Sequence, residues 1–339
     1  MFIAKDFSRF QNLFVSQLKN MLSDNELGAF ILVLANSQQD AFLKNALQDE
    51  LENTFTALKN RFSTGKLQAP QDDIDVFKQL LDIELENVGL WKYRAAGDWE
   101  VACNSMRRLR PARASSQQFS SIQQPYDETG FHFNKPFLKP EILWEEHYRG
   151  IKLRVLFNKF PFSDYHLLIV VSPEQNSSQL LTGDAHRYVF SLVAETACVL
   201  PGFGVGFNSL AAGASVNHLH FQGFVRQQYF SIEKDHWSHN GGKLEYPLEV
   251  KCFADTGSSW AYLEQLTAQD IAFNCLYRGG CCYVIPRKYQ GSVELPDWLT
   301  GAGWIDVAGA ITVSDEETFH AIDHQSVIDA LVLLSENNS

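Results

Sequence analysis

Apolar residues recur every three or four positions through the first 90 residues, which is the spacing of amphipathic helices. One such set is Phe10, Leu13, Phe14, Leu18, Met21 and Leu22. A second set predicts a helix over residues 40–62 with a buried side formed by Phe42, Leu43, Leu47, Leu51, Phe55 and Leu58. Gly65 and Pro70 then mark a loop before a third helix near residues 72–88. No candidate chemistry falls here, so we expect packing or dimerisation.

The pattern changes to strands in the middle of the chain. Residues 151–157 alternate in polarity as a half-buried strand does, and residues 166–171 form the continuous apolar run of a fully buried strand. A helix is expected over roughly 182–199, ended by Pro201 and Gly202. A strand near 205–208, a loop of small residues at 211–215 and a strand that carries His218 and His220 follow.

A weak internal repeat suggests a duplicated unit. Phe157-Asn158 before the apolar run at 166–171 has a counterpart in Phe273-Asn274 before the run at 282–286, and the later copy has no pair of histidines. We therefore predict an α+β fold with three parts. Residues 1–106 are a helical N-terminal extension, residues 107–235 a catalytic unit and residues 236–339 a second, degenerate copy of that unit.

Composition narrows the class of partner. With 339 residues, 45% of them hydrophobic, the chain can bury at least one large core. A formal net charge of −12 argues against nucleic acid as a partner, because such binding needs a basic surface. A small anionic substrate would need a local positive pocket. Four arginines, Arg107, Arg108, Arg110 and Arg113, form either a phosphate clamp or a solvated loop.

Cysteine usage and the N-terminus bear on compartment and metals. The six cysteines form no CxxC pair and no regular framework, which favours a reducing compartment and argues against a disulfide scaffold and a cysteine-ligated zinc. The N-terminus lacks the layout of a signal peptide, and no apolar run is long enough to cross a bilayer. The pairs His236/His239 and His320/His324 lack further ligands to complete a metal site. We expect a cytoplasmic protein with no membrane contact, metal or cofactor.

The segment from Asn217 to Gln222 carries the most specific pattern in the chain. On a strand, alternate residues share a face, so His218, His220 and Gln222 should point the same way, with apolar residues behind them. The alternative interpretation is that these are core histidines whose hydrogen bonds are satisfied and which have no role in function. Three polar side chains on one face of an apolar strand favour a functional site instead.

The residue types suit attack on phosphorus. Imidazole is a good nucleophile and is partly neutral at pH 7, and a backbone carbonyl that accepts from one ring nitrogen would aim the other at the phosphate. Small residues upstream allow backbone N–H groups to approach phosphate oxygens, and Ser215 adds a hydroxyl. The Gln222 amide can donate to the same oxygens but cannot easily act as a general acid or base. A glutamine at this position therefore favours transfer of the nucleotidyl group to a phosphate acceptor over transfer to water.

This HxHxQ segment resembles the site of the galactose-1-phosphate uridylyltransferase branch of the histidine-triad superfamily. Residues 157–162 (FNKFPF) with 165–168 (YHLL), and 206–210 (GFNSL) with 213–215 (GAS), resemble segments of diadenosine tetraphosphate phosphorylases. Residues 216–222 (VNHLHFQ), together with 110–111, 123–127 and 131–135, resemble GDP-L-galactose (GDP-hexose) phosphorylases. The resemblance spans about residues 107–319 and implies histidine-triad-like antiparallel sheets with helical cover.

The resemblance also implies roles for individual residues. It makes His220 the nucleophile that is transiently nucleotidylated, with His218 and Gln222 as its partners. Residues expected to bind the substrate are Asn208, Ser215, Gly213, Asn158, Lys159, Arg110, Arg278 and Arg287. Asn208 and Ser215 are expected at the α-phosphate or ribose, and the candidates for the distal phosphates are Lys159, Arg278, Arg287 and Lys288. The cysteine metal ligands of the uridylyltransferases have no counterpart here, which again predicts no structural metal.

The expected reaction is a double displacement. A nucleoside diphosphate sugar or dinucleoside polyphosphate loses a phosphorylated leaving group to His220, and inorganic phosphate or a sugar phosphate then takes the nucleotidyl group. Two alternatives stay open at this point. One is a nucleotide hydrolase that uses the same histidine, and the other is a non-catalytic nucleotide-binding protein. The base, the leaving group and the oligomeric state, with a homodimer as one option, are not determined by the sequence.

Overall fold

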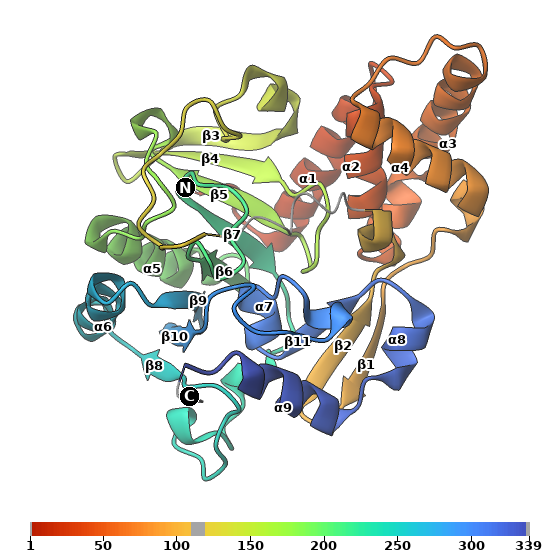
Figure 1. The fold of residues 1–339 in the computed structure, drawn as a ribbon. Coiled ribbons are helices and arrows are strands. Elements are labelled where there is room, and N and C mark those ends of the chain that lie inside the picture. The colour runs from red at the N-terminus through yellow and green to blue at the C-terminus, as the bar shows by residue number, and fades with distance from the viewer. Residues whose placement is uncertain (1, 110–118, 337–339) are drawn as a thin grey trace.

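An eight-stranded, entirely antiparallel sheet runs through the computed structural model, which describes residues 2–109 and 119–336 (Figure 1). Its strands, in spatial order, are β3 (Ile142–Tyr148), β4 (Ile151–Phe157), β5 (Leu167–Val171), β7 (His220–Val225), β6 (Phe203–Asn208), β9 (Ala272–Arg278), β10 (Cys281–Arg287) and β8 (Lys251–Phe253). The strands predicted at 151–157, 166–171 and 205–208 are confirmed to within two residues.

The sheet contains a duplicated helix–strand–strand unit. Helix α5 (Gly183–Ala197) precedes β6 and β7, and α6 (Thr256–Ala268) precedes β9 and β10. The two units meet where β6 pairs with β9, with Asn208 opposite Asn274, and α5 and α6 lie next to each other (Figure 1). The sequence repeat used to predict the duplication was the wrong one, since Phe157 ends β4 whereas Phe273 lies near the start of β9.

Four helices form the N-terminal part of the chain, at upper right in Figure 1. They are α1 (Phe7–Met21), α2 (Leu27–Ser37), α3 (Ala41–Ser63) and α4 (Gln71–Ile83). Asp6 and Asp40 cap α1 and α3 by accepting a backbone N–H at 2.8 Å. The helices predicted around Phe10–Leu22 and over residues 40–62 are confirmed, although Phe42 is 46% exposed. The third predicted helix ends at Ile83 and does not reach residue 88. Helix α2 was not predicted separately, because it is apolar on every side and therefore shows no periodic face.

The predicted helical extension ends earlier than residue 106. Strands β1 (Lys92–Ala96) and β2 (Trp99–Cys103) form a hairpin, and β2 pairs in parallel with β11 (Ala310–Val313) from the far end of the chain. The two-residue Gly97-Asp98 turn, with Gly97 at φ 66°, was the overlooked hairpin signal. Around this small sheet lie α7 (Trp304–Val307), α8 (Glu316–Ala321) and α9 (His324–Leu333). Short 3-10 helices span Leu85–Asn87, Ser105–Leu109, Pro136–Glu141, Pro173–Gln175, Ser231–Glu233, Ser238–Asn240 and Asp297–Leu299.

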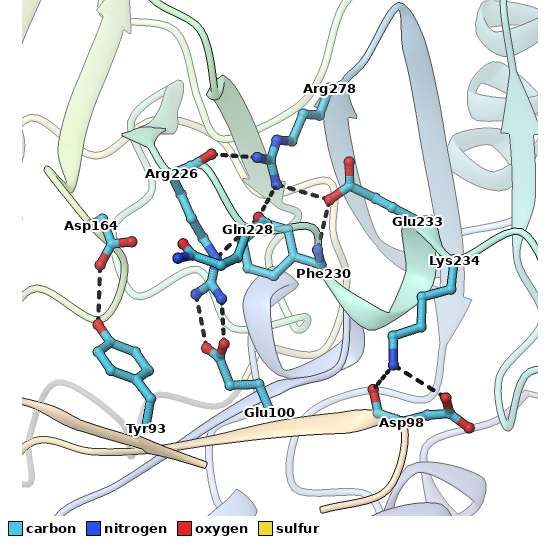
Figure 2. Close-up of polar contacts among 10 residues, drawn as sticks. All are labelled: Tyr93, Asp98, Glu100, Asp164, Arg226, Gln228, Phe230, Glu233, Lys234 and Arg278. Carbon is cyan, nitrogen blue, oxygen red and sulfur yellow. Dashed lines mark hydrogen bonds and ion pairs between the residues drawn. The ribbon is translucent and has the colours of Figure 1, made fainter. Parts of the chain in front are cut away.

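A polar cluster ties the small sheet to the main sheet (Figure 2). Arg226, directly after β7, donates from its two terminal nitrogens to the carboxylate of Glu100 on β2, and the bond from Nη1 is 2.8 Å long. Arg278 at the end of β9 pairs with Glu233 at 2.9 Å, and both of these side chains are only 5% exposed. The further contacts are Tyr93 with Asp164 at 3.0 Å and Lys234 with Asp98 at 3.1 Å.

Three features of the structure bear on membrane contact, cysteine chemistry and metal binding. Among the described residues, no helix is both long and apolar enough to cross a membrane. All six cysteines have free thiols. Within the same described residues, no group of three or more histidine, cysteine, aspartate or glutamate side chains is arranged to hold a metal ion.

Candidate active site

A cleft of about 1060 Å³ brings together segments from every part of the chain. Its walls include the end of helix α1, the starts of α2 and α4, the 3-10 helix at Pro136–Glu141, the loop after β4, the loop at 213–216 and the turn before α7. His220 and Gln222, on β7, form part of the lining. The face of β7 that carries them is opposite the face of Phe221, which is packed into the main core.

His220 is held so that one ring nitrogen is available. Its Nδ1 lies 2.8 Å from the backbone carbonyl of His218, and a carbonyl can only accept, so Nδ1 carries the proton. Its Nε2 makes no hydrogen bond within the described part of the chain. Gln179 fixes the backbone of His220, because its amide accepts from the His220 N–H at 2.9 Å and donates to the His220 carbonyl at 3.1 Å.

Burial keeps this imidazole neutral. Desolvation lowers the pKa of His220 from 6.5 to about 4, and the hydrogen bond to the His218 carbonyl opposes that shift without cancelling it. The pKa of His218 is likewise lowered to about 4, first by burial and then by the neighbouring histidines. At neutral pH the Nε2 lone pair of His220 is therefore free for nucleophilic attack without a separate base.

We expect nitrogen NMR of histidine-labelled protein to show His220 as the neutral tautomer protonated at Nδ1 from pH 8 down to about pH 5. The sign follows from the lowered pKa, because a proton binds to the folded protein only as the pH approaches about 4. The resonance is assigned by its loss in His220→Ala. Imidazolium signals from His220 already at pH 6.5 would contradict the lowered pKa that burial gives this ring.

His218 does not share the strand face predicted for it. Strand β7 begins at His220, and His218 precedes it in a bend, outside the lining of the cleft. Its Nδ1 accepts the backbone N–H of Phe133 at 3.1 Å, and its ring stacks on the ring of Phe133 at 5.8 Å. In this arrangement His218 acts on His220 through its backbone carbonyl, and its side chain is buried.

Asn208 and Gln222 both line the cleft with one side-chain atom already engaged. The Asn208 oxygen accepts from the Asn274 amide and from the Trp304 backbone N–H, both at 2.7 Å. The Gln222 oxygen accepts from the indole Nε1 of Trp304, also at 2.7 Å. Because both oxygens are occupied, the amide nitrogens are the donors that remain for a substrate oxygen.

Four further predicted residues, Gly213, Ser215, Asn158 and Lys159, also line the cleft. Gly213 has φ 96°, and a Cβ there would lie 2.8 Å from the Ala302 carbonyl, so this position requires glycine. The Lys159 amine pairs with Asp73 at the start of α4 at 2.6 Å. Helix α4 therefore contributes directly to the site, which the sequence pattern of that helix did not indicate.

Three predicted cations, Arg278, Arg287 and Lys288, are not brought to the cleft. Arg278 is buried against Glu233 in the polar cluster of Figure 2. Arg287 is fully buried and donates to the Ala302 carbonyl at 2.7 Å, and Lys288 does not line the cleft either. Arg110 and Arg113 lie outside the described residues. Arg107 does line the cleft, with its guanidinium 5.0 Å from the ring centroid of Phe162.

Sequence reasoning missed several residues that shape the site. They are Phe133, Gln179, Trp304, Glu141 and His166 in its role beside Gln222. Burial lowers the pKa of His166 to about 3, aided by Arg107 and His220, while the neighbouring Gln222 side chain acts in the opposite direction. Burial raises the pKa of Glu141, which lines the cleft, to about 7. His166 lies in the segment 165–168, which resembles a segment of diadenosine tetraphosphate phosphorylases. Trp304 and Gln179 lie in segments without a recognised sequence motif.

The antiparallel sheet with its duplicated helix–strand–strand units and a single HxHxQ segment defines a histidine-triad-like fold. Yeast Ap4A phosphorylase Apa2 in complex with Ap4A has the same fold, with a TM-score of 0.51 at 16% identity over 79% of this chain and 98% of that one. Another structure of the same enzyme gives a TM-score of 0.50 over 80% of this chain.

Residues 98–224 match the family described as "GDPGP1-like, N-terminal domain", and this span contains His220, Gln222 and Asn208. GDP-D-glucose phosphorylase 1 of Danio rerio is 35% identical over 161 residues, which are 44% of this chain and 46% of that protein. The Xenopus laevis protein of the same name is 40% identical over 205 residues, 52% of this chain and 51% of that protein. GDP-L-galactose phosphorylase 2 of Arabidopsis thaliana is 29% identical over 166 residues, 40% of this chain and 38% of that protein.

The chain thus matches about half, or less, of the length of these relatives. The resemblance predicted from the sequence is confirmed: residues 98–224 match a family model of GDPGP1-like N-terminal domains, and the chain is similar to GDP-hexose phosphorylases in sequence and to Ap4A phosphorylase in fold.

Proposed function

We propose that this protein is a nucleotide-sugar phosphorylase that cleaves a GDP-hexose through a guanylylated His220 and releases hexose 1-phosphate. The observation that carries the proposal is the state of His220, a neutral imidazole in the cleft whose Nδ1 is fixed by the His218 carbonyl. The names of the relatives, GDP-D-glucose and GDP-L-galactose phosphorylases, supply the substrate class.

The reaction is balanced in two displacements. The His220 Nε2 attacks the α-phosphorus of the GDP-hexose, the bond from that phosphorus to the bridging oxygen breaks, and hexose 1-phosphate leaves with the electron pair. An oxygen of inorganic phosphate then attacks the same phosphorus, the phosphorus–nitrogen bond breaks, and GDP forms. Each displacement inverts the configuration at phosphorus, so the overall outcome is retention with ping-pong kinetics.

The surroundings of His220 support stabilisation of a negatively charged transition state. The amide nitrogens of Asn208 and Gln222 are oriented donors, and the Ser215 hydroxyl lies in the same cleft. Arg107 and Lys159 add positive charge along its wall. Donors that are already fixed need no reorganisation during the reaction, which makes their contribution to catalysis large.

The decisive experiment incubates the protein with GDP-hexoses, other nucleoside diphosphate sugars and Ap4A, each with and without inorganic phosphate. A GDP-hexose phosphorylase turns over GDP-hexose only with phosphate. Without phosphate, intact-mass analysis should show one covalently bound GMP per chain.

Other outcomes would replace the proposal. Continued turnover without phosphate would identify a hydrolase in which water resolves the intermediate. Tight nucleotide binding without turnover or adduct would identify a nucleotide-binding protein. Turnover of Ap4A alone would keep the mechanism but change the substrate class.

The proposed partners are the nucleotide sugar and inorganic phosphate. The use of its cysteines suits a reducing compartment, and we therefore propose that the reaction takes place in the cytoplasm. Whether the protein acts as a homodimer is a separate prediction, which sedimentation of the purified chain tests.

A further inference from the structure

We propose that Trp304 is a positioning residue that sets the orientation of the Gln222 amide and thereby aims its N–H donor at the reacting phosphate. The inference rests on the proposed function, because it assigns a task to a side chain within that reaction. Trp304 is fully buried and does not line the cleft, so it acts on the substrate only through its neighbours.

The orientation of Gln222 needs an external cause. A glutamine amide has an oxygen that accepts and a nitrogen that donates, and rotation by 180° exchanges the two at almost no steric cost. Only one orientation presents a donor to a phosphate oxygen, since the other would place an acceptor against negative charge. The indole Nε1 of Trp304 is solely a donor, and it lies 2.7 Å from the Gln222 oxygen. The hydrogen bond therefore selects the orientation that leaves the nitrogen for the substrate.

The sheet is built to admit the indole at this place. Gly206 on β6 is directly opposite Gln222 in the strand register. A Cβ on Gly206 would lie 2.2 Å from the Trp304 ring, so any other residue would displace the indole. The indole also stacks on Phe224 at 5.0 Å with only 12° between the ring planes. The missing side chain of Gly206 leaves space for the indole, and packing against Phe224 restricts its movement. Together these two contacts fix the position of Nε1.

The same residue also orients Asn208. The backbone N–H of Trp304 donates to the Asn208 oxygen at 2.7 Å, and that oxygen also accepts from Asn274. Asn208 and Gln222 thus receive their orientation from one residue at the start of α7. Trp304→Phe therefore removes the indole donor to Gln222 but keeps the backbone donor to Asn208.

The test compares Trp304→Phe with Trp237→Phe. Trp237 is a matched control, since it is also a buried tryptophan and its indole donates to the Ser231 carbonyl at 2.7 Å, away from the cleft. We expect Trp304→Phe to lower kcat by about 10- to 100-fold, with KM for the GDP-hexose little changed, because a misoriented donor is lost from the transition state. Trp237→Phe should retain nearly the kcat of the wild type.

A double-mutant cycle separates positioning from general loosening of the fold. If Trp304 acts through Gln222, then adding Trp304→Phe to Gln222→Ala lowers kcat little further. Equal kcat values for the two tryptophan variants, or losses from Trp304→Phe and Gln222→Ala that multiply in full, would overturn the proposal.

A second measurement is independent of both activity and the stability of Trp304→Phe. In a spectrum of the indole N–H groups of the seven tryptophans, Gln222→Leu should move one resonance upfield and speed its exchange with solvent. A spectrum unchanged by Gln222→Leu would show that the hydrogen bond does not exist. If the wild type turns over no nucleotide sugar, the proposed function fails, whereas the indole resonance still decides whether Trp304 holds Gln222.

Discussion

His220→Ala is expected to lower kcat/KM by on the order of 10⁴-fold or more, and to abolish the covalent adduct seen without phosphate. The reason is that the variant removes the only atom proposed to bond to phosphorus, whereas the oriented amides of Asn208 and Gln222 remain. Binding of the nucleotide sugar should therefore persist, since most of the cleft is unchanged. The measurement combines initial rates, intact-mass analysis and nucleotide binding by calorimetry.

The control for this prediction is His320→Ala. His320 lies on α8 with a side chain that is 71% exposed, and it has no place in the cleft. It should leave kcat/KM unchanged. Substantial turnover by His220→Ala, or an adduct that survives in it on another residue, would mean that this imidazole is not the nucleophile.

The second large effect is expected on stability. Glu233→Ala should lower the free energy of unfolding by about 3–5 kcal/mol, because it leaves the guanidinium of Arg278 buried without its carboxylate. The two side chains are each 5% exposed and 2.9 Å apart (Figure 2). The change also removes the carboxylate that accepts the backbone N–H of Phe230 at 2.8 Å. Denaturant unfolding monitored by tryptophan fluorescence measures the loss.

An exposed ion pair provides the matched control. Lys92 and Glu316 also join two separate segments, but their side chains are 59% and 55% exposed. Solvent screens such a pair, so Glu316→Ala should change the free energy of unfolding far less than Glu233→Ala does. If both glutamate variants lose the same small amount, Arg278 is reached by water and the cluster in Figure 2 is not a buried one.

The structure gives different roles to Arg278 and Lys159, which were grouped together on the basis of sequence. Arg278 was predicted to bind distal phosphates, yet the structure places it in a buried ion pair between secondary-structure elements. Lys159 was predicted for the same task, and it does line the cleft. The local sequence pattern did not distinguish the two residues. The difference depends on which elements pack against each strand.

The sequence by itself determined the features that arise from near neighbours. The amphipathic spacing of α1 and α3 and the strands β4 and β5 follow from side-chain periodicity over about ten residues. The segment around His220 was identifiable because the geometry that fixes its ring is also local: the carbonyl that accepts from Nδ1 is only two residues away.

Only the tertiary structure decided the contacts between distant segments. The indole that orients Gln222 comes from a residue 82 positions further along the chain, and the strand that completes the small sheet comes from beyond residue 309. The N-terminal helices gave no sign in their sequence that Asp73 would meet Lys159 at the cleft. A hydrogen bond between remote residues depends on the packing of whole elements, and the free energy of that packing is spread over many apolar side chains rather than encoded near either partner.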